Sequence, residues 1–207
     1  MHQQETGTSA PRFDWLEHSP DGSLTAFTSI PLAPGVMRRL MDKLFVENWS
    51  HIVVGPCLQG AVFEIRFVQA PQVRYSDGYL TVDLGAWHFH LCVEEHKGSR
   101  SEELRRMRPV ARAAFWEQRP PSPTNACGCG GRSWGLRFWN GYGEQMTSVF
   151  LPNPRLTDEM QILKQPDWSR LDLYYRLRAE FLGEAIPGDY EAAAHLPFPA
   201  IVANPAE

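Results

Sequence analysis

The fold class is decided by residues 75–93, which read YSDGYLTVDLGAWHFHLCV. Apolar and polar side chains alternate along residues 79–84 and again along residues 86–93, and a period of two indicates half-buried β-strands. The Asp77-Gly78 pair between the first two strands readily takes the positive φ angles of a tight turn. This stretch therefore predicts an antiparallel sheet that begins with a hairpin.

The flanking sequence adds further strands and three helical segments. Alternation predicts strands at 61–68, 133–140 and 144–151, with a first strand at 25–31. Apolar residues recur every fourth position after Gly35 and again after Asp167, which is the spacing of one buried helix face, and Gly183 is placed to end the second helix. Residues 101–118 also read as helical, with Pro109 either bending the helix or starting a new one. We expect an α+β fold, a mostly antiparallel sheet with helices packed on one face.

Length and composition bound the domain organisation. With 207 residues and 43% hydrophobic residues, one domain with appendages is expected, and intrinsic disorder is not. We predict a flexible amino-terminal arm over residues 1–24, a single α+β domain over 25–185 and a carboxyl-terminal extension over 186–207. The polar start of the chain lacks a secretory signal pattern, and with only four Cys we expect a cytoplasmic protein and no disulfide scaffold.

Charge and hydropathy argue against two classes of partner. The net charge of −4 does not indicate a nucleic-acid-binding protein, and no apolar run is long enough to span a membrane. Only three of the 20 basic residues are Lys, and guanidinium groups suit the recognition of small anions, although an Arg-rich surface also arises from genomic composition. A small-molecule ligand is compatible with these features, and the oligomeric state is not indicated.

The main functional candidate is the strand that contains His88, His90 and Cys92. In an extended strand these three side chains point to the face opposite Trp87, Phe89, Leu91 and Val93. Alternate residues lie about 6.5 to 7 Å apart along a strand, so two imidazoles can converge on one ion. His and Cys are unusual on a merely solvated face, and the sequence therefore predicts a metal site here.

The loop Cys127-Gly128-Cys129 offers two more thiols on a flexible backbone. Two imidazoles and two thiolates would make a closed tetrahedral zinc site, whereas three ligands would leave a position for chemistry. His96 is a further candidate ligand or a partner that fixes an imidazole tautomer. The cofactor expected is a transition-metal ion, zinc or iron first, with haem as another option.

A second group of candidates lies in the predicted hairpin at 140–145, for Asn140 and Glu144, and on the polar sides of predicted strands, for Arg66 and Arg137. Glu144 is a candidate acid/base, and Arg66, Arg137 and Asn140 are candidate substrate-binding residues. The simpler interpretation of this hairpin is a Gly-rich turn with aromatic flanks.

Three functions remain open on the sequence. The first is a metal-binding protein, which could be a metal-dependent enzyme acting on a small molecule, anionic or neutral. The second is a thiol–disulfide redox protein that uses Cys127 and Cys129. The third is a non-enzymatic binding protein with a structural metal or none. The sequence does not decide whether the chain is an enzyme.

Overall fold

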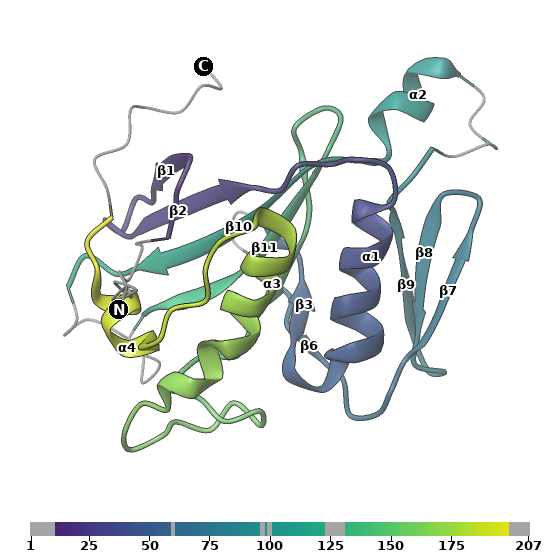
Figure 1. Ribbon diagram of the computed structural model, residues 1–207. Coiled ribbons are helices and arrows are strands. Elements are labelled where there is room, and N and C mark those ends of the chain that lie inside the picture. The colour runs from purple at the N-terminus through teal and green to yellow at the C-terminus, as the bar shows by residue number, and fades with distance from the viewer. Residues whose placement is uncertain (1–10, 59–60, 96–97, 99–100, 123–130, 199–207) are drawn as a thin grey trace, which may run out of the picture. The chain divides into compact units, whose positions relative to one another are not determined.

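The computed structural model describes residues 11–58, 61–95, 98, 101–122 and 131–198 (Figure 1). The chain divides into two compact units, each assembled from separate stretches of sequence. The first unit comprises Met1–Thr28, Glu117–Arg132 and Pro152–Glu207, and the second comprises Ser29–Trp116 and Ser133–Leu151. In the described ranges, no helix has both the length and the apolar character needed to cross a membrane.

The larger sheet of the second unit is built around one hairpin. Its strands follow the order β10, β11, β12, β3, β6, and β12 pairs antiparallel with β11 and with β3, which in turn pairs antiparallel with β6. The bounds are β3 Val53–Gly55, β6 Ile65–Arg66, β10 Val110–Arg119, β11 Ser133–Asn140 and β12 Gln145–Phe150. A short antiparallel pair, β4 Cys57–Leu58 with β5 Ala61–Val62, also belongs to this unit. The strands predicted at 133–140 and 144–151 are confirmed.

The smaller sheet of the second unit contains the stretch that decided the fold class. It runs in the order β7 Gln72–Ser76, β8 Tyr79–Asp83, β9 His88–Cys92, with both pairings antiparallel. Asp77 and Gly78 form the β7–β8 turn with φ angles of 49° and 82°, as expected for an Asp-Gly hairpin connection. The predicted hairpin and the predicted third strand are confirmed.

One helical segment covers the apolar face of this smaller sheet (Figure 1). It consists of α1 Val36–Asp42, a π-helical turn η1 Lys43–Glu47 and a 3₁₀ turn η2 Trp49–His51. Phe45 of η1 packs edge-on against Phe89 with ring centroids 5.7 Å apart. The hydroxyl of Tyr75 donates a hydrogen bond of 2.8 Å to the Asp42 carboxylate. With one face of β7–β8–β9 occupied in this way, its polar side chains lie on the other face.

The first unit contains one hairpin and the carboxyl-terminal helices. Strand β1 Trp15–His18 pairs antiparallel with β2 Leu24–Ser29, and the helices are η3 Trp168–Leu171, α3 Asp172–Leu182 and α4 Tyr190–His195. The Asp167 side chain accepts a hydrogen bond from the Ser169 amide, and Gly183 ends α3 with a φ of 70°. The stop predicted at Gly183 is therefore confirmed, whereas Asp167 caps η3, the 3₁₀ turn that leads into α3.

The prediction of a helix over 101–118 is wrong beyond residue 107. Only α2 Glu102–Met107 is helical, and β10 follows Pro109, which has no amide hydrogen to continue the helix. Ala113 to Trp116 are all buried, because both faces of this part of β10 are covered. Such a run has no alternation and is easily mistaken for a buried helix.

Two further segments differ from expectation. Residues 61–68 form β5 and β6 rather than one strand, because the Phe63 amide donates to the Pro56 carbonyl and leaves the ladder. Strand β1 lies within the segment 1–24, which we expected to be a flexible arm, and there Trp15 is buried and stacks on Phe27 with centroids 4.8 Å apart. The α+β class with mostly antiparallel pairing is confirmed.

Candidate functional site

The polar face of β7–β8–β9 carries His88 and His90, whose side chains are both exposed. The strand register sets three rows of directly opposed residues across this face, namely Gln72–Asp83–His88, Arg74–Thr81–His90 and Ser76–Tyr79–Cys92. Nearly all of these side chains can form hydrogen bonds or bind ions. The candidate metal ligands of β9 therefore lie on this polar sheet face.

The two imidazoles lie side by side and one of them is held by a neighbour. Their ring centroids are 5.0 Å apart at an interplanar angle of 68°. Thr81 Oγ1 lies 2.8 Å from Nδ1 of His90, and the Tyr79 ring packs edge-on to the same imidazole. Since Nδ1 of His90 is engaged by the hydroxyl, Nε2 is the nitrogen that remains for a ligand. A hydrogen bond at the other ring nitrogen is how metal-binding imidazoles are usually oriented.

The spacing of the rings suits one shared metal ion. An imidazole nitrogen binds zinc at about 2.1 Å, which puts the ring centroid about 3.2 Å from the metal. Two centroids that are 5.0 Å apart then subtend an angle of about 100° at the metal, close to the tetrahedral value. The centroid spacing of His88 and His90 therefore matches that of two imidazoles bound to one tetrahedral ion.

Asp83 is the carboxylate opposite His88, but its oxygens are already engaged. Its Oδ2 accepts a hydrogen bond of 2.6 Å from Arg74, and its Oδ1 accepts one of 2.8 Å from the Gly85 amide. The Arg74 side chain of this ion pair is 62% exposed, and an ion pair this open to solvent on one side contributes at most about 1 kcal/mol. We therefore count Asp83 as a neighbour of the imidazole pair and not as a ligand.

Cys92 shares the strand face with the imidazoles but not their exposure. Its side chain is only 3% exposed, and its thiol donates to the Glu94 carbonyl oxygen at 3.1 Å. Burial raises the pKa of the Cys92 thiol. Because the thiolate is the form that binds metals, a protonated and buried thiol is a poor ligand. Of the three candidate ligands on β9, the two exposed imidazoles therefore remain.

The other predicted ligands, Cys127, Cys129 and His96, lie outside the described residues. Among the residues that are described, His, Cys, Asp and Glu form no group of three or more that could hold a metal ion.

The remaining candidate residues lie in the β11–β12 hairpin, for Asn140 and Glu144, and on strands β6 and β11, for Arg66 and Arg137. The Asn140 side chain accepts hydrogen bonds from the Tyr142 and Glu144 amides and donates one of 2.9 Å to the Glu144 carboxylate. These contacts are those of a tight turn, and both side chains stabilise it. Arg66 is exposed on β6, and two strands separate it from Arg137 on β11. The geometry thus gives Asn140 and Glu144 a structural role.

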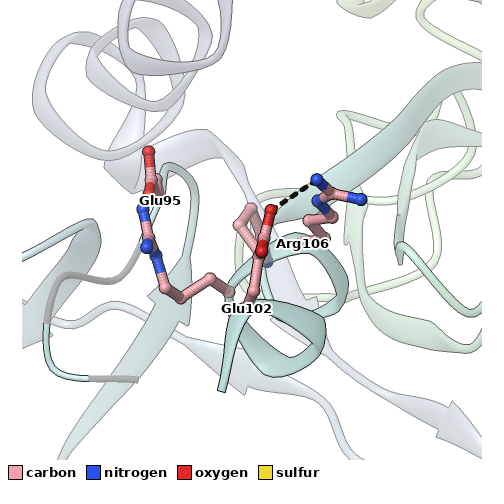
Figure 2. Close-up of a pocket in the computed structure, with 5 residues that line it drawn as sticks. Glu95, Glu102 and Arg106 are labelled. Carbon is pink, nitrogen blue, oxygen red and sulfur yellow. Dashed lines mark hydrogen bonds and ion pairs between the residues drawn. The ribbon is translucent and has the colours of Figure 1, made fainter. Parts of the chain in front are cut away.

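A shallow pocket of about 280 Å³ lies beside α2 in the second unit (Figure 2). It is lined by Glu95, Glu102, Arg105, Arg106 and Pro109. Arg105 pairs with Glu95, and Arg106 pairs with Glu102. Each carboxylate thus has a guanidinium partner and all four side chains are largely exposed, so the pocket presents no excess charge to a ligand.

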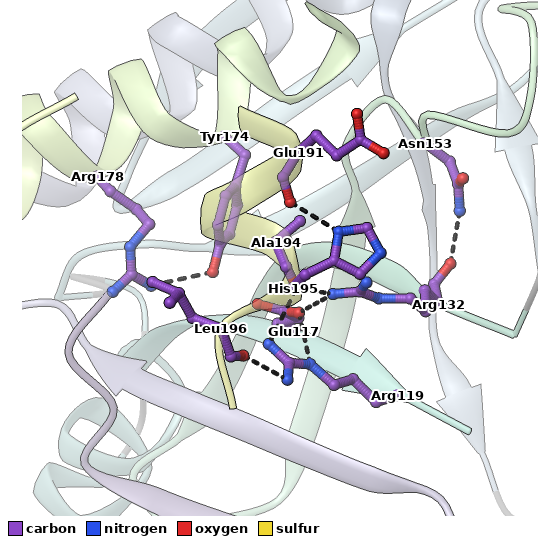
Figure 3. Close-up of polar contacts among 10 residues, drawn as sticks. All are labelled: Glu117, Arg119, Arg132, Asn153, Tyr174, Arg178, Glu191, Ala194, His195 and Leu196. Atoms are coloured by element: carbon purple, nitrogen blue, oxygen red, sulfur yellow. Dashed lines mark hydrogen bonds and ion pairs between the residues drawn. The ribbon is translucent and has the colours of Figure 1, made fainter. Parts of the chain in front are cut away.

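A buried polar cluster in the first unit was not predicted from the sequence (Figure 3). Glu117 is 1% exposed, and its carboxylate accepts hydrogen bonds from Arg119 at 2.8 Å and from Arg132 at 2.7 Å. Both guanidinium groups also donate to the carbonyl oxygen of Ala194 near the end of α4. Two cations at a helix carboxyl terminus complement its unpaired carbonyl groups. We therefore interpret this cluster as a clamp that holds α4.

The comparisons with known proteins bear on the family and not on the chemistry. Residues 14–183 match a family described as a family of unknown function (DUF7676). No curated protein matches the chain. The matched region includes β9 with its imidazole pair and ends at the stop of α3. Because the match extends over most of the sequence, the chain belongs to this family of unknown function, DUF7676.

Proposed function

We propose that this protein binds a transition-metal ion, zinc in the first place, through His88 and His90. The observation that carries the proposal is the pair of exposed imidazoles on one strand face, with centroids 5.0 Å apart and one ring held at Nδ1 by Thr81. Neutral imidazole is a good ligand for zinc and for copper. The nearby Arg74–Asp83 pair is neutral overall, so it does not repel a cation.

Two protein ligands leave coordination positions for other groups. Water or a small anionic molecule could take these positions, which is the arrangement that metal-assisted chemistry requires. Thiolates of Cys127 and Cys129 are the other donors that the sequence offers. The first question is therefore whether the imidazole pair binds metal by itself.

The test is a calorimetric titration of the chelator-treated full-length protein with zinc chloride. The titration is repeated in a Cys127→Ser/Cys129→Ser background, which removes the thiols predicted as ligands. We expect His88→Ala and His90→Ala to lower zinc affinity at least tenfold in both backgrounds, since a lone imidazole does not chelate. His18→Ala is the matched control, because His18 is also exposed at the end of a strand, in the first unit.

A second variant tests the role of the hydroxyl. Thr81→Val keeps the β-branched shape and removes the group that holds Nδ1 of His90. Loss of such a partner lowers metal affinity about 10- to 100-fold. The proposal fails if the wild-type chain takes up no zinc. It also fails if His88→Ala and His90→Ala, made in the Cys127→Ser/Cys129→Ser background, bind zinc as tightly as that background itself.

A further inference from the structure

Strand β9 is the last strand of its sheet. In the order β7–β8–β9, and within the part of the chain that is described, β9 has a hydrogen-bonded strand neighbour only in β8. An edge strand with open backbone groups is a template for pairing with another strand. The imidazole pair of the proposed metal site therefore stands at a sheet edge.

The hydrogen bonds at the two ends of β9 show which of its residues face that edge. The Leu84 amide donates to the Trp87 carbonyl at 3.0 Å, and the Val93 amide donates to the Gly78 carbonyl at 2.9 Å. In an antiparallel strand the amide and the carbonyl of one residue point the same way, and the direction alternates along the chain. Residues 87, 89, 91 and 93 thus direct their backbone groups toward β8. The backbone groups of His88 and His90 point to the open edge.

The open edge of β9 would allow a second copy of the same strand to pair with it about a two-fold axis. If the axis passes at Phe89, His88 of each copy stands opposite His90 of the other copy. The backbone groups that point outward are those of His88 and His90. His88 of each copy would therefore exchange two backbone hydrogen bonds with His90 of the other copy. The interface is self-complementary, as a two-fold contact requires.

The same arrangement brings four imidazoles together. Side chains opposed across an antiparallel pair have Cβ atoms about 4.5 to 5.5 Å apart and lie on the same face. The two rings within one chain have centroids 5.0 Å apart, so the four imidazoles would lie on one face around the two-fold axis. A tetrahedral zinc ion takes four ligands, and one chain supplies two described imidazoles. Two copies would complete the coordination shell.

We infer that β9 is a dimerisation edge, at which two copies of this chain pair antiparallel around Phe89 and hold one zinc ion between their four imidazoles. The inference rests on the proposed function, because the imidazole pair has to bind zinc. It adds a partner, which is a second copy of the chain, and a stoichiometry of one metal ion for two chains.

The experiment combines three measurements on the full-length protein in the Cys127→Ser/Cys129→Ser background, with and without zinc chloride. Calorimetry gives the number of zinc ions per chain, and sedimentation equilibrium gives the mass. Amide hydrogen exchange followed by NMR gives the protection of single residues in β9. We expect one zinc ion for two chains, a doubling of the mass with zinc, and exchange at His88 and His90 slowed by at least about tenfold. Amides of Phe89 and Leu91 already face β8, so their protection should change less.

The outcomes separate this inference from the proposed function. One zinc ion per chain with an unchanged mass would overturn the dimer and leave the proposed function standing. Absence of zinc uptake would overturn both. A zinc-dependent dimer without slower exchange at His88 and His90 would overturn the strand pairing. If the inference holds, the His90→Ala variant keeps the mass of one chain when zinc is added. The His18→Ala variant doubles its mass with zinc, as the Cys127→Ser/Cys129→Ser parent does.

Discussion

Replacement of Arg178 should destabilise the folded chain strongly. This side chain is fully buried in the first unit. Its guanidinium donates two hydrogen bonds of 2.8 Å to the Glu184 carboxylate. It also donates to the Arg12 carbonyl, to Thr28 Oγ1 and to the Tyr174 hydroxyl. One residue thus connects α3, β2 and the segment before β1.

The magnitude follows from what Arg178→Met leaves behind. Removing one partner of a buried ion pair costs about 3 to 5 kcal/mol, because the other charge remains uncompensated. The Glu184 side chain is 22% exposed and can regain some water, so we take the lower end, about 3 kcal/mol. Methionine keeps much of the aliphatic volume, which limits the contribution of a cavity.

The matched control lies on the same helix. Arg176 forms an ion pair of 2.6 Å with Asp172, but the two side chains are 54% and 47% exposed. Exposed pairs at this helical spacing contribute about 0.3 to 0.5 kcal/mol. Arg176→Met should therefore cost several times less than Arg178→Met.

Urea denaturation followed by circular dichroism measures both variants. If the cost of Arg178→Met comes from the uncompensated carboxylate, the double variant Arg178→Met/Glu184→Met should recover part of it. A loss below about 1 kcal/mol for Arg178→Met, or a loss equal to that of Arg176→Met, would refute the reasoning.

Three further predictions concern backbone, proton and thiol behaviour. Gly85→Ala should lower the free energy of unfolding, measured by urea denaturation, by about 1 kcal/mol, because residue 85 has a positive φ. Gly78→Ala should lower it clearly more, because the added Cβ would also lie 2.4 Å from a backbone carbonyl oxygen. Burial raises the pKa of Tyr174 and Tyr175, so the native state retains protons that the unfolded state loses. The free energy of unfolding should then fall as pH rises above about 10, and tyrosinate absorbance of the native chain should lag behind that of the unfolded chain. Burial also raises the pKa of Cys92, and iodoacetamide at mildly alkaline pH should modify this thiol in urea but not in the native chain, as read by mass spectrometry.

The sequence alone determined the features that depend on neighbouring residues. Alternation along residues 86–93 was sufficient to place His88 and His90 on one face of a strand, because side-chain direction in a strand has a period of two. The turn at Asp77-Gly78 and the stop at Gly183 were also readable, since both depend on local backbone freedom.

Only the tertiary structure decided which segments and side chains are covered. The sequence predicts a helix through residue 118 where the structure has a strand from Val110, because a strand buried on both faces has the same apolar character as a buried helix. The burial of Cys92 beside two exposed imidazoles, and the approach of Arg119 and Arg132 to Glu117, depend on residues distant in the sequence. The pattern of neighbouring residues sets the direction of a side chain, whereas long-range packing sets its solvent exposure and its partners.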